Sequence, residues 1–112
     1  MPIKSNNAAN SVLVLITDTT LLHPTTGRAT ITFASLHEQT GADETVELFI
    51  STDSSSAAGE RLDKFIMAAD ETVSPTSLAG LTIASGSYLI AKGTTGSLVE
   101  SNISYTQYSG AS

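Results

Sequence analysis

Hydrophobic and polar residues alternate over a series of short segments along the 112-residue chain. Because successive side chains of a β-strand point to opposite faces, this alternation predicts strands that bury one face. The segments are separated by clusters of small and polar residues that are typical of turns. About seven to eight short strands spaced in this way are typical of an antiparallel sandwich. We therefore expect an all-β fold, either an antiparallel β-sandwich or a small jelly-roll-like barrel.

The first ten residues differ from the rest of the chain. Residues 1–10 (MPIKSNNAAN) are polar, contain a proline and lack a hydrophobic period, which predicts a flexible N-terminal arm. Residues 11–112 are expected to form a single β-sandwich domain. The first strand, 11–17, is apolar in both alternating phases, and Leu13 and Leu15 occupy the second phase. Such a strand needs a cover for each face, and in so small a domain we expect one cover to be another subunit.

The middle of the chain predicts a β-hairpin. Residues 28–37 and 44–52 both alternate, and the glycine-containing segment 39–43 between them indicates a turn. In this phase Leu36 and Phe49 point outward, where they extend the apolar patch of the first strand. The residues expected to point inward are Ala29, Ile31 and Phe33 on the first strand of the hairpin, and Val46, Leu48 and Ile50 on the second.

The second half of the chain predicts shorter elements. Residues 60–69 fit either an amphipathic helix or a strand, and the β setting favours the strand. Residues 78–84 and 87–92 are predicted strands joined by a tight turn at Ser85–Gly86. The strand 98–108 closes the domain, with Val99, Ile103 and Tyr105 on one face. The segment 19–27 is expected to be a turn-rich connection.

Charge and composition exclude several classes of partner. The formal net charge is -6, from five basic and eleven acidic residues, and the basic residues are scattered. Nucleic-acid binding requires clustered cations, so we expect no nucleic-acid partner. The longest apolar run, 12–16, is far shorter than the roughly 20 residues that span a bilayer, so we expect no membrane partner. Cysteine is absent, which excludes disulfides and thiolate metal sites and fits synthesis in a reducing cytosol, although chance explains the absence equally well.

The sequence offers no recognisable active site. His23 and His37 belong to no short-spacing metal motif and are expected to be surface or structural residues. The adjacent carboxylates at 43–44 and 70–71 lie in or beside predicted turns and make poor acid–base pairs. The run 53–56 lacks the ligand pattern of an EF-hand, although a weak calcium site there stays open. We therefore expect no catalytic residue, no cofactor and no metal site, and a protein that is not an enzyme.

The stretch 21–53 (LLHPTTGRATITFASLHEQTGADETVELFISTD) resembles a pattern in small structural proteins of tailed bacteriophages. In that pattern a strand ends in a proline–glycine turn, a basic residue opens an alternating strand, and a polar turn leads to a strand of the type TVELFI. The turn 69–72 and the segment 78–90 are similar to the closing hairpins of those β-sandwiches. The resemblance covers most of the chain and rests on pattern rather than on a diagnostic motif.

The resemblance implies a virion structural protein, above all a capsid decoration (cement) protein on the outer surface of a tailed-phage head. Such a protein is made in the host cytoplasm, binds the phage major capsid protein and commonly forms a homotrimer. A tail- or fibre-associated protein, or a host-surface binding module, is the alternative. The residues expected to contact sister subunits or the shell are Leu13, Leu15, Leu36 and Phe49, together with Ser5, Asn6 and Asn7 of the arm.

Overall fold

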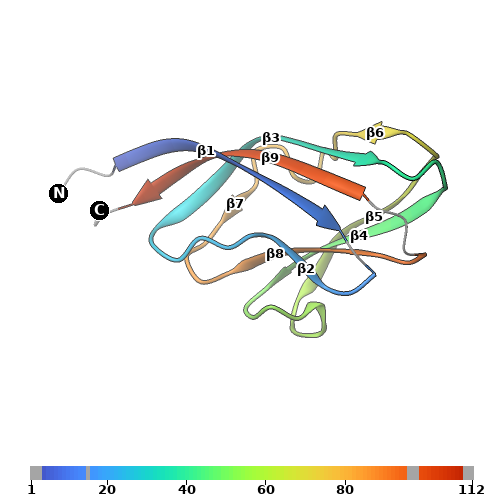
Figure 1. Cartoon of the computed structure of the whole chain (residues 1–112). Helices are drawn as coiled ribbons and strands as arrows, with labels where there is room; N and C mark the ends of the chain where they lie inside the picture. The colour runs from blue at the N-terminus through green and yellow to red at the C-terminus, as the bar shows by residue number, and fades with distance from the viewer. Residues whose placement is uncertain (1–3, 15, 96–98, 110–112) are drawn as a thin grey trace.

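The computed structural model describes residues 4–14, 16–95 and 99–109. Two antiparallel sheets pack face to face in this part of the chain, which confirms the predicted β-sandwich (Figure 1). The strands are β1 (Lys4–Val14), β2 (Thr19–Leu22), β3 (Arg28–Glu38), β4 (Glu44–Ser51), β5 (Glu60–Met67), β6 (Thr72–Val73), β7 (Thr82–Ile83), β8 (Tyr88–Gly93) and β9 (Val99–Ser109). A short 3₁₀ turn, Ser56–Ala58, precedes β5.

The strands divide between the sheets without following their order in the chain. Sheet A has the order β1-β9-β3-β6, and β7 also pairs with β3. Sheet B has the order β2-β8-β4-β5. In Figure 1 the long strands β1, β9 and β3 form the upper layer, and the strands of sheet B lie below them. The chain therefore crosses repeatedly from one sheet to the other.

The predicted hairpin of residues 28–52 is wrong, because its two strands lie in different sheets. β3 pairs with β9, β6 and β7, whereas β4 pairs with β5 and β8. The alternating pattern indicates which face of a strand is buried, and both strands do bury their apolar faces in the same core. It does not indicate which strand lies alongside. The segments before and after Ser85–Gly86 also separate, since β7 joins sheet A and β8 joins sheet B.

The N-terminal arm is the second correction. β1 begins at Lys4, and it pairs residue by residue with β9 from Lys4 opposite Ser109 to Val14 opposite Val99. The absence of a hydrophobic period in residues 4–10 was a poor guide, because the backbone hydrogen bonds of a strand do not depend on its side chains. Residues 1–3 lie outside the described part of the chain.

Two shorter elements also bear on the predictions. Residues 60–67 form strand β5 rather than a helix, which confirms the preferred interpretation of that ambiguous segment. Residues 19–22, expected to be part of a connection, form the short strand β2, which pairs with β8.

A β-bulge in β3 changes which residues of that strand face the core. Ile31 lies opposite Tyr105 and Phe33 lies opposite Ser104, so Thr32 is an extra residue in β3. A bulge of this kind shifts the side-chain phase by one position. Ala29 and Ile31 point inward before the bulge as predicted, but Phe33 is 54% exposed. The residues that point inward after the bulge are Ala34, Leu36 and Glu38.

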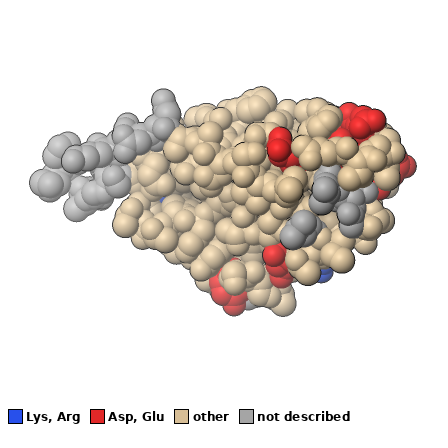
Figure 2. All heavy atoms as spheres, viewed as in Figure 1, with Lys and Arg blue, Asp and Glu red and all other residues tan. Residues whose placement is uncertain are grey.

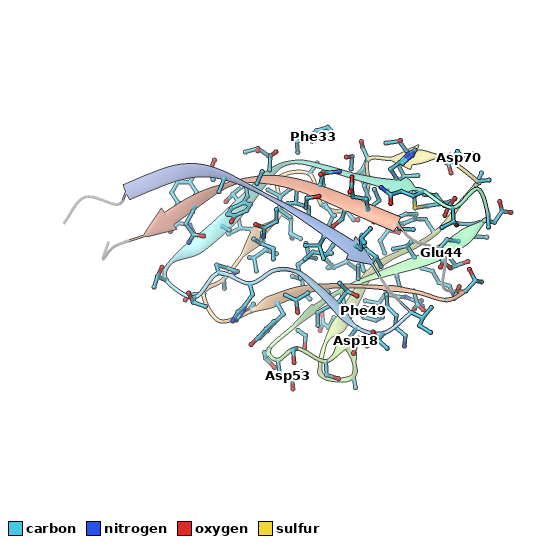
Figure 3. The ribbon with its side chains drawn as sticks, in the orientation of Figure 1. Asp18, Phe33, Glu44, Phe49, Asp53 and Asp70 are labelled. Atoms are coloured by element: carbon cyan, nitrogen blue, oxygen red, sulfur yellow. The ribbon has the colours of Figure 1, made fainter. Side chains whose placement is uncertain are left out.

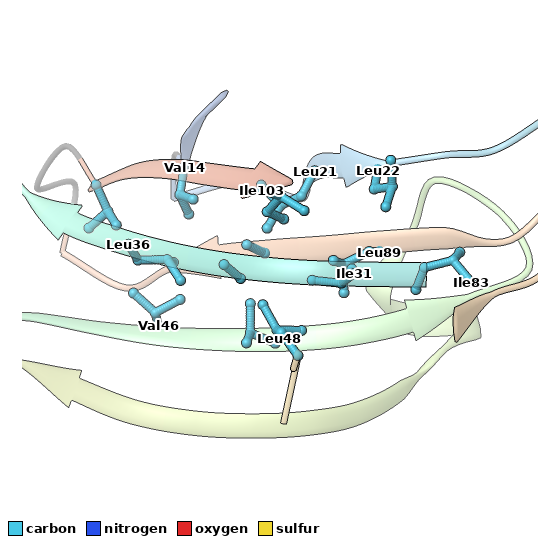
Figure 4. Close-up of a cluster of buried hydrophobic side chains, with 14 of the residues drawn as sticks. Val14, Leu21, Leu22, Ile31, Leu36, Val46, Leu48, Ile83, Leu89 and Ile103 are labelled. Carbon is cyan, nitrogen blue, oxygen red and sulfur yellow. The ribbon is translucent and has the colours of Figure 1, made fainter. Parts of the chain in front are cut away.

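The core lies between the inner faces of the two sheets. Figure 4 shows Ile31 and Leu36 of β3 facing Val46 and Leu48 of β4 across the sandwich. The fully or nearly fully buried hydrophobic residues also include Val14, Leu21, Leu22, Met67, Leu78, Ile83, Leu89, Val99 and Ile103. None of the described helical turns is long or apolar enough to cross a membrane.

Candidate assembly surface

Leu36 does not belong to an interface. Its side chain is 0% exposed and lies in the core, so the prediction that it points outward is wrong. The physical reason is the bulge at Thr32, which reverses the phase of every later residue of β3. The sequence does carry a signal of this change, because the apolar positions move from 29 and 31 to 34 and 36.

The remaining predicted interface residues are not gathered in one patch. Leu13 is 43% exposed on the outer face of sheet A. Phe49 is half-buried on the outer face of sheet B, where its register partner on β8 is the fully buried Ile90. Figure 3 shows Phe33 above the upper sheet and Phe49 on the lower side of the molecule. Leu15 lies outside the described residues.

Ser5, Asn6 and Asn7 are placed by their backbone only. They lie near the start of β1, opposite Tyr108, Gln107 and Thr106 of β9. Their side chains lie outside the described part of the structure, so the predicted contacts with a shell stay a prediction.

The outer face of sheet A is uncharged over most of its area. We define the sheet A face by its outward residues: Ala9, Ser11 and Leu13 of β1, Asn102, Ser104 and Thr106 of β9, and Thr30, Thr32, Phe33 and Ser35 of β3. None of these residues is charged. Charged residues of the same layer lie at its two ends, at Arg28 and at Glu100, and Glu100 is the register partner of Leu13. In Figure 2 the acidic groups gather towards the right-hand end and the lower part of the molecule.

Hydroxyl groups on or beside the sheet A face are hydrogen-bonded within the protein. The Oγ1 atoms of Thr30 and Thr82 lie 2.9 Å apart. The Thr32 hydroxyl donates to the backbone oxygen of Ser104 at 3.1 Å. At the edge of the face, His37 Nδ1 lies 2.8 Å from Thr72 Oγ1. Removing a polar group from water costs less when it already has a hydrogen-bond partner, so this face can be covered at low cost.

The outer face of sheet B has the opposite character. Lys92, Glu47 and Lys64 lie side by side on β8, β4 and β5 in register. Arg61 also forms an ion pair with Glu47, with 3.3 Å between Nη1 and Oε2. Beside this row, Thr45, Lys64 and Phe65 help to line a surface hollow. Alternating opposite charges of this kind suit a face that stays in water.

Two buried carboxylates hold the loops at one end of the sandwich. Glu38 is fully buried and accepts hydrogen bonds from the backbone N–H groups of Thr40, Gly41 and Ala42, which lie in the turn that crosses between the sheets. The Thr40 hydroxyl donates to Glu38 at 2.7 Å, and this bond, with the backbone donors, lowers the pKa of Glu38 to about 2. A carboxylate with so low a pKa stays ionised at neutral pH and makes a poor proton donor.

Glu44 has the same structural role on the adjoining loop. Its carboxylate accepts hydrogen bonds from the backbone and side chains of Thr94 and Thr95. Burial alone would raise the pKa of Glu44, but these hydrogen bonds outweigh it and the pKa is lowered. Both buried carboxylates therefore serve the fold. Sequence reasoning missed this role because it placed Glu44 in or beside a turn and did not consider Glu38.

The other candidate groups also have local partners. His23 stacks on Tyr88 with ring centroids 3.6 Å apart, and its Nδ1 lies 2.9 Å from the backbone oxygen of Ser87. Asp53 accepts from the backbone N–H of Ser55 at 2.8 Å, as in a local turn. Within the described residues, no group of three or more histidine, cysteine or acidic side chains is placed to hold a metal ion.

The fold and its surface define a small antiparallel β-sandwich with one charged face and one uncharged face. No family model matches the chain, and no curated protein matches it. The fold is similar to that of a solved structure described as "Bacillus endospore appendages form a novel family of disulfide-linked pili". The TM-score is 0.58 at 13% identity, and the match covers 96% of this chain and 89% of the other.

A second match is a crystal structure of PirA, with a TM-score of 0.42 at 16% identity over 90% of this chain and 92% of the other. That score is too low to support a conclusion. At 13% identity the first likeness concerns the fold alone.

Proposed function

We propose that this protein is a structural subunit that assembles with copies of itself and performs no catalysis. The observation that carries the proposal is the uncharged sheet A face, which exposes Leu13 and Phe33 on a chain with a net charge of -6. Two acidic molecules repel each other least where charge is absent. Burying the exposed parts of these two side chains contributes roughly 1 kcal/mol each, a modest gain that a repeating assembly multiplies.

Within this class, the sequence resemblance favours a capsid decoration protein on a tailed-phage head, with the major capsid protein as its partner and a homotrimer as its state. A sandwich with one adhesive face suits this role, because a protein that binds only the assembled shell stabilises it by mass action. The structural neighbour's description names pili, which are also assemblies of repeated subunits. That description specifies disulfide links, and this chain has no cysteine, so its own assembly would not be held by disulfides.

The first experiment is light scattering of the purified protein over a range of micromolar concentrations. We expect species larger than the 11.6 kDa monomer. Leu13→Lys, which places a charge on the sheet A face at its edge strand β1, should shift the population towards the monomer. Ser54→Lys is the matched control, since it adds the same charge on an exposed loop beside sheet B. A wild-type protein that stays monomeric at every concentration would refute self-assembly.

The second experiment distinguishes the capsid decoration hypothesis from a protein that polymerises without a partner. Co-sedimentation with undecorated phage heads should bring down the wild-type protein in high copy number if it decorates capsids. Filaments seen by electron microscopy in the absence of any partner would instead favour a self-contained polymer. Binding to neither heads nor copies of itself would leave the structural role without support.

A further inference from the structure

The outer edge of β1 differs from every other sheet edge in the described part of the chain. β1 is 11 residues long and pairs with β9 without a register shift. From Ser5 to Val14 it contains no charged residue and no proline. An edge strand presents unpaired backbone N–H and C=O groups, which makes a long, regular and uncharged edge a template for another strand.

The other edges carry the features that normally prevent such pairing. Four of the eight residues of β5 are charged, and its pairing with β4 shifts register between Leu48 and Phe49. β2 has four residues and an irregularity of its own. β6 and β7 have two residues each. Charges, bulges and short length all blunt an edge, so only β1 lacks protection among the described strands.

Side-chain hydrogen bonds also hold β1 in its extended conformation. The Ser101 hydroxyl of β9 donates to the backbone oxygen of Val12 at 3.0 Å. The Asn10 side-chain amide donates to the backbone oxygen of Leu21 in β2 at 3.1 Å. These bonds fix the strand to both sheets from its inner side. In Figure 1, β1 lies at the border of the upper layer, with β9 beside it. A preformed strand loses little conformational entropy when a partner adds to it.

We propose that the outer edge of β1 pairs antiparallel with β1 of a second copy, which joins two A sheets into one continuous sheet. This inference rests on the proposed function and specifies its contact. The occupant is a second copy because β1 is the only described strand that is long, regular and uncharged enough to match β1. Pairing with β5 of another copy would place its charged residues against an uncharged strand.

The length of β1 determines how many hydrogen bonds this contact can form. Eleven residues extend over roughly 37 Å, and full overlap would form on the order of ten hydrogen bonds between the two copies. Antiparallel pairing of identical strands is two-fold symmetric, so the contact closes as a dimer. A dimer of about 23 kDa, twice the monomer mass of 11.6 kDa, differs from the homotrimer that the phage resemblance implies. The two-fold contact also brings any new charge on β1 close to the same charge on β1 of the second copy.

The test combines charge substitution with cross-linking. Ala9→Lys and Ser11→Lys should raise the dimer dissociation constant on the order of tenfold, because like charges on paired strands repel. Asn102→Lys lies beside Ser11 on the same face but one strand away from the edge, and it should have a smaller effect. Thermal unfolding of each variant at concentrations where it is monomeric checks that the fold is retained. Equal effects of Ser11→Lys and Asn102→Lys would indicate face-to-face packing and overturn the edge contact.

Cross-linking gives the register directly, because the chain has no cysteine of its own. Single cysteines at positions 8 to 13 should form intermolecular disulfides after mild oxidation, with one maximum where β1 meets itself. Lys64→Cys on the edge strand β5 is the matched control and should form no intermolecular disulfide. An oligomeric protein without β1 cross-links would refute this contact and leave the proposed function intact. A monomeric protein would refute both.

Discussion

The substitutions Leu36→Ala and Leu13→Ala should distinguish a core residue from a residue of the assembly surface. Leu36 is fully buried between the sheets, whereas Leu13 is 43% exposed on the sheet A face. Leu→Ala in a packed core costs about 2–5 kcal/mol, and more where the surroundings cannot collapse into the cavity. Leu36 lies on a central strand flanked by β9 and β6, so we expect a loss of about 3–4 kcal/mol for Leu36→Ala.

Leu13→Ala should affect the isolated monomer much less. The side chain is only half removed from water, so its truncation should cost roughly 0.5–1 kcal/mol of unfolding free energy. Its main effect should instead be on association, since Leu13 lies on the sheet A face beside the β1 edge. Leu36→Ala should leave that face unchanged and the association of folded protein nearly unaltered.

The assay is urea unfolding at concentrations where the protein is monomeric, paired with light scattering at higher concentrations. With a slope of about 1–3 kcal/mol/M, Leu36→Ala should lower the urea midpoint by roughly 1–4 M. At the same slope, Leu13→Ala should lower the midpoint by only about 0.2–1 M. Equal losses of monomer stability for the two variants would refute the assignment of Leu36 to the core and Leu13 to the surface.

Three further predictions follow from single features. The pKa of Glu38 is lowered from 4.5 to about 2, so the stability that its ionised carboxylate contributes is complete above pH 4.5 and is lost as the pH falls towards 2. Glu38→Gln should therefore make the melting temperature depend less on pH between 4.5 and 2 in a series of thermal unfolding measurements. A Cβ on Gly59 would collide with the backbone oxygen of Ile50, so Gly59→Ala should cost about 1–3 kcal/mol in urea unfolding. Added salt should strengthen association in light scattering, because it screens the net charge of -6 without weakening uncharged contacts; weaker association in salt would contradict this reasoning.

The class of fold could be predicted from the sequence because the alternating pattern depends only on local geometry. Val46, Leu48, Val99 and Ile103 are buried as that pattern requires. Segment 60–67 is a strand even though its spacing also fits a helix, since it pairs with β4 along its length. These features are fixed by the residues of one segment and by the character of the chain around it.

Pairing between strands could not be predicted in the same way. The turn at 39–43 has the composition of a hairpin loop, but the bonds from Thr40, Gly41 and Ala42 to the buried Glu38 support a turn that crosses to the other sheet. The edge strand β1 was missed over residues 4–10 because its stability comes from β9, more than 90 residues away in the chain. Contacts of this kind depend on the whole fold.

Which residues of the expected interface are exposed could be predicted only in part. An exposed apolar position on the first strand was expected, and Leu13 occupies one. The bulge at Thr32 then exchanged two residues between surface and core, since it exposed Phe33 and buried Leu36. A single inserted residue therefore removed Leu36 from the expected interface, as the two-residue period of a strand requires.

The distribution of charge over the two outer faces is not demanded by folding. Outward positions on a sheet tolerate charged side chains with little effect on stability, as the row Lys92, Glu47 and Lys64 on sheet B shows. The sheet A face and the β1 edge have the same access to water, yet they carry serine, threonine, asparagine and exposed apolar residues. On a chain with eleven acidic residues, an uncharged face that continues into an unprotected edge is best explained by contact with another molecule. Without cysteine, that contact contains no disulfide, and this surface offers backbone hydrogen bonds and apolar burial to hold it.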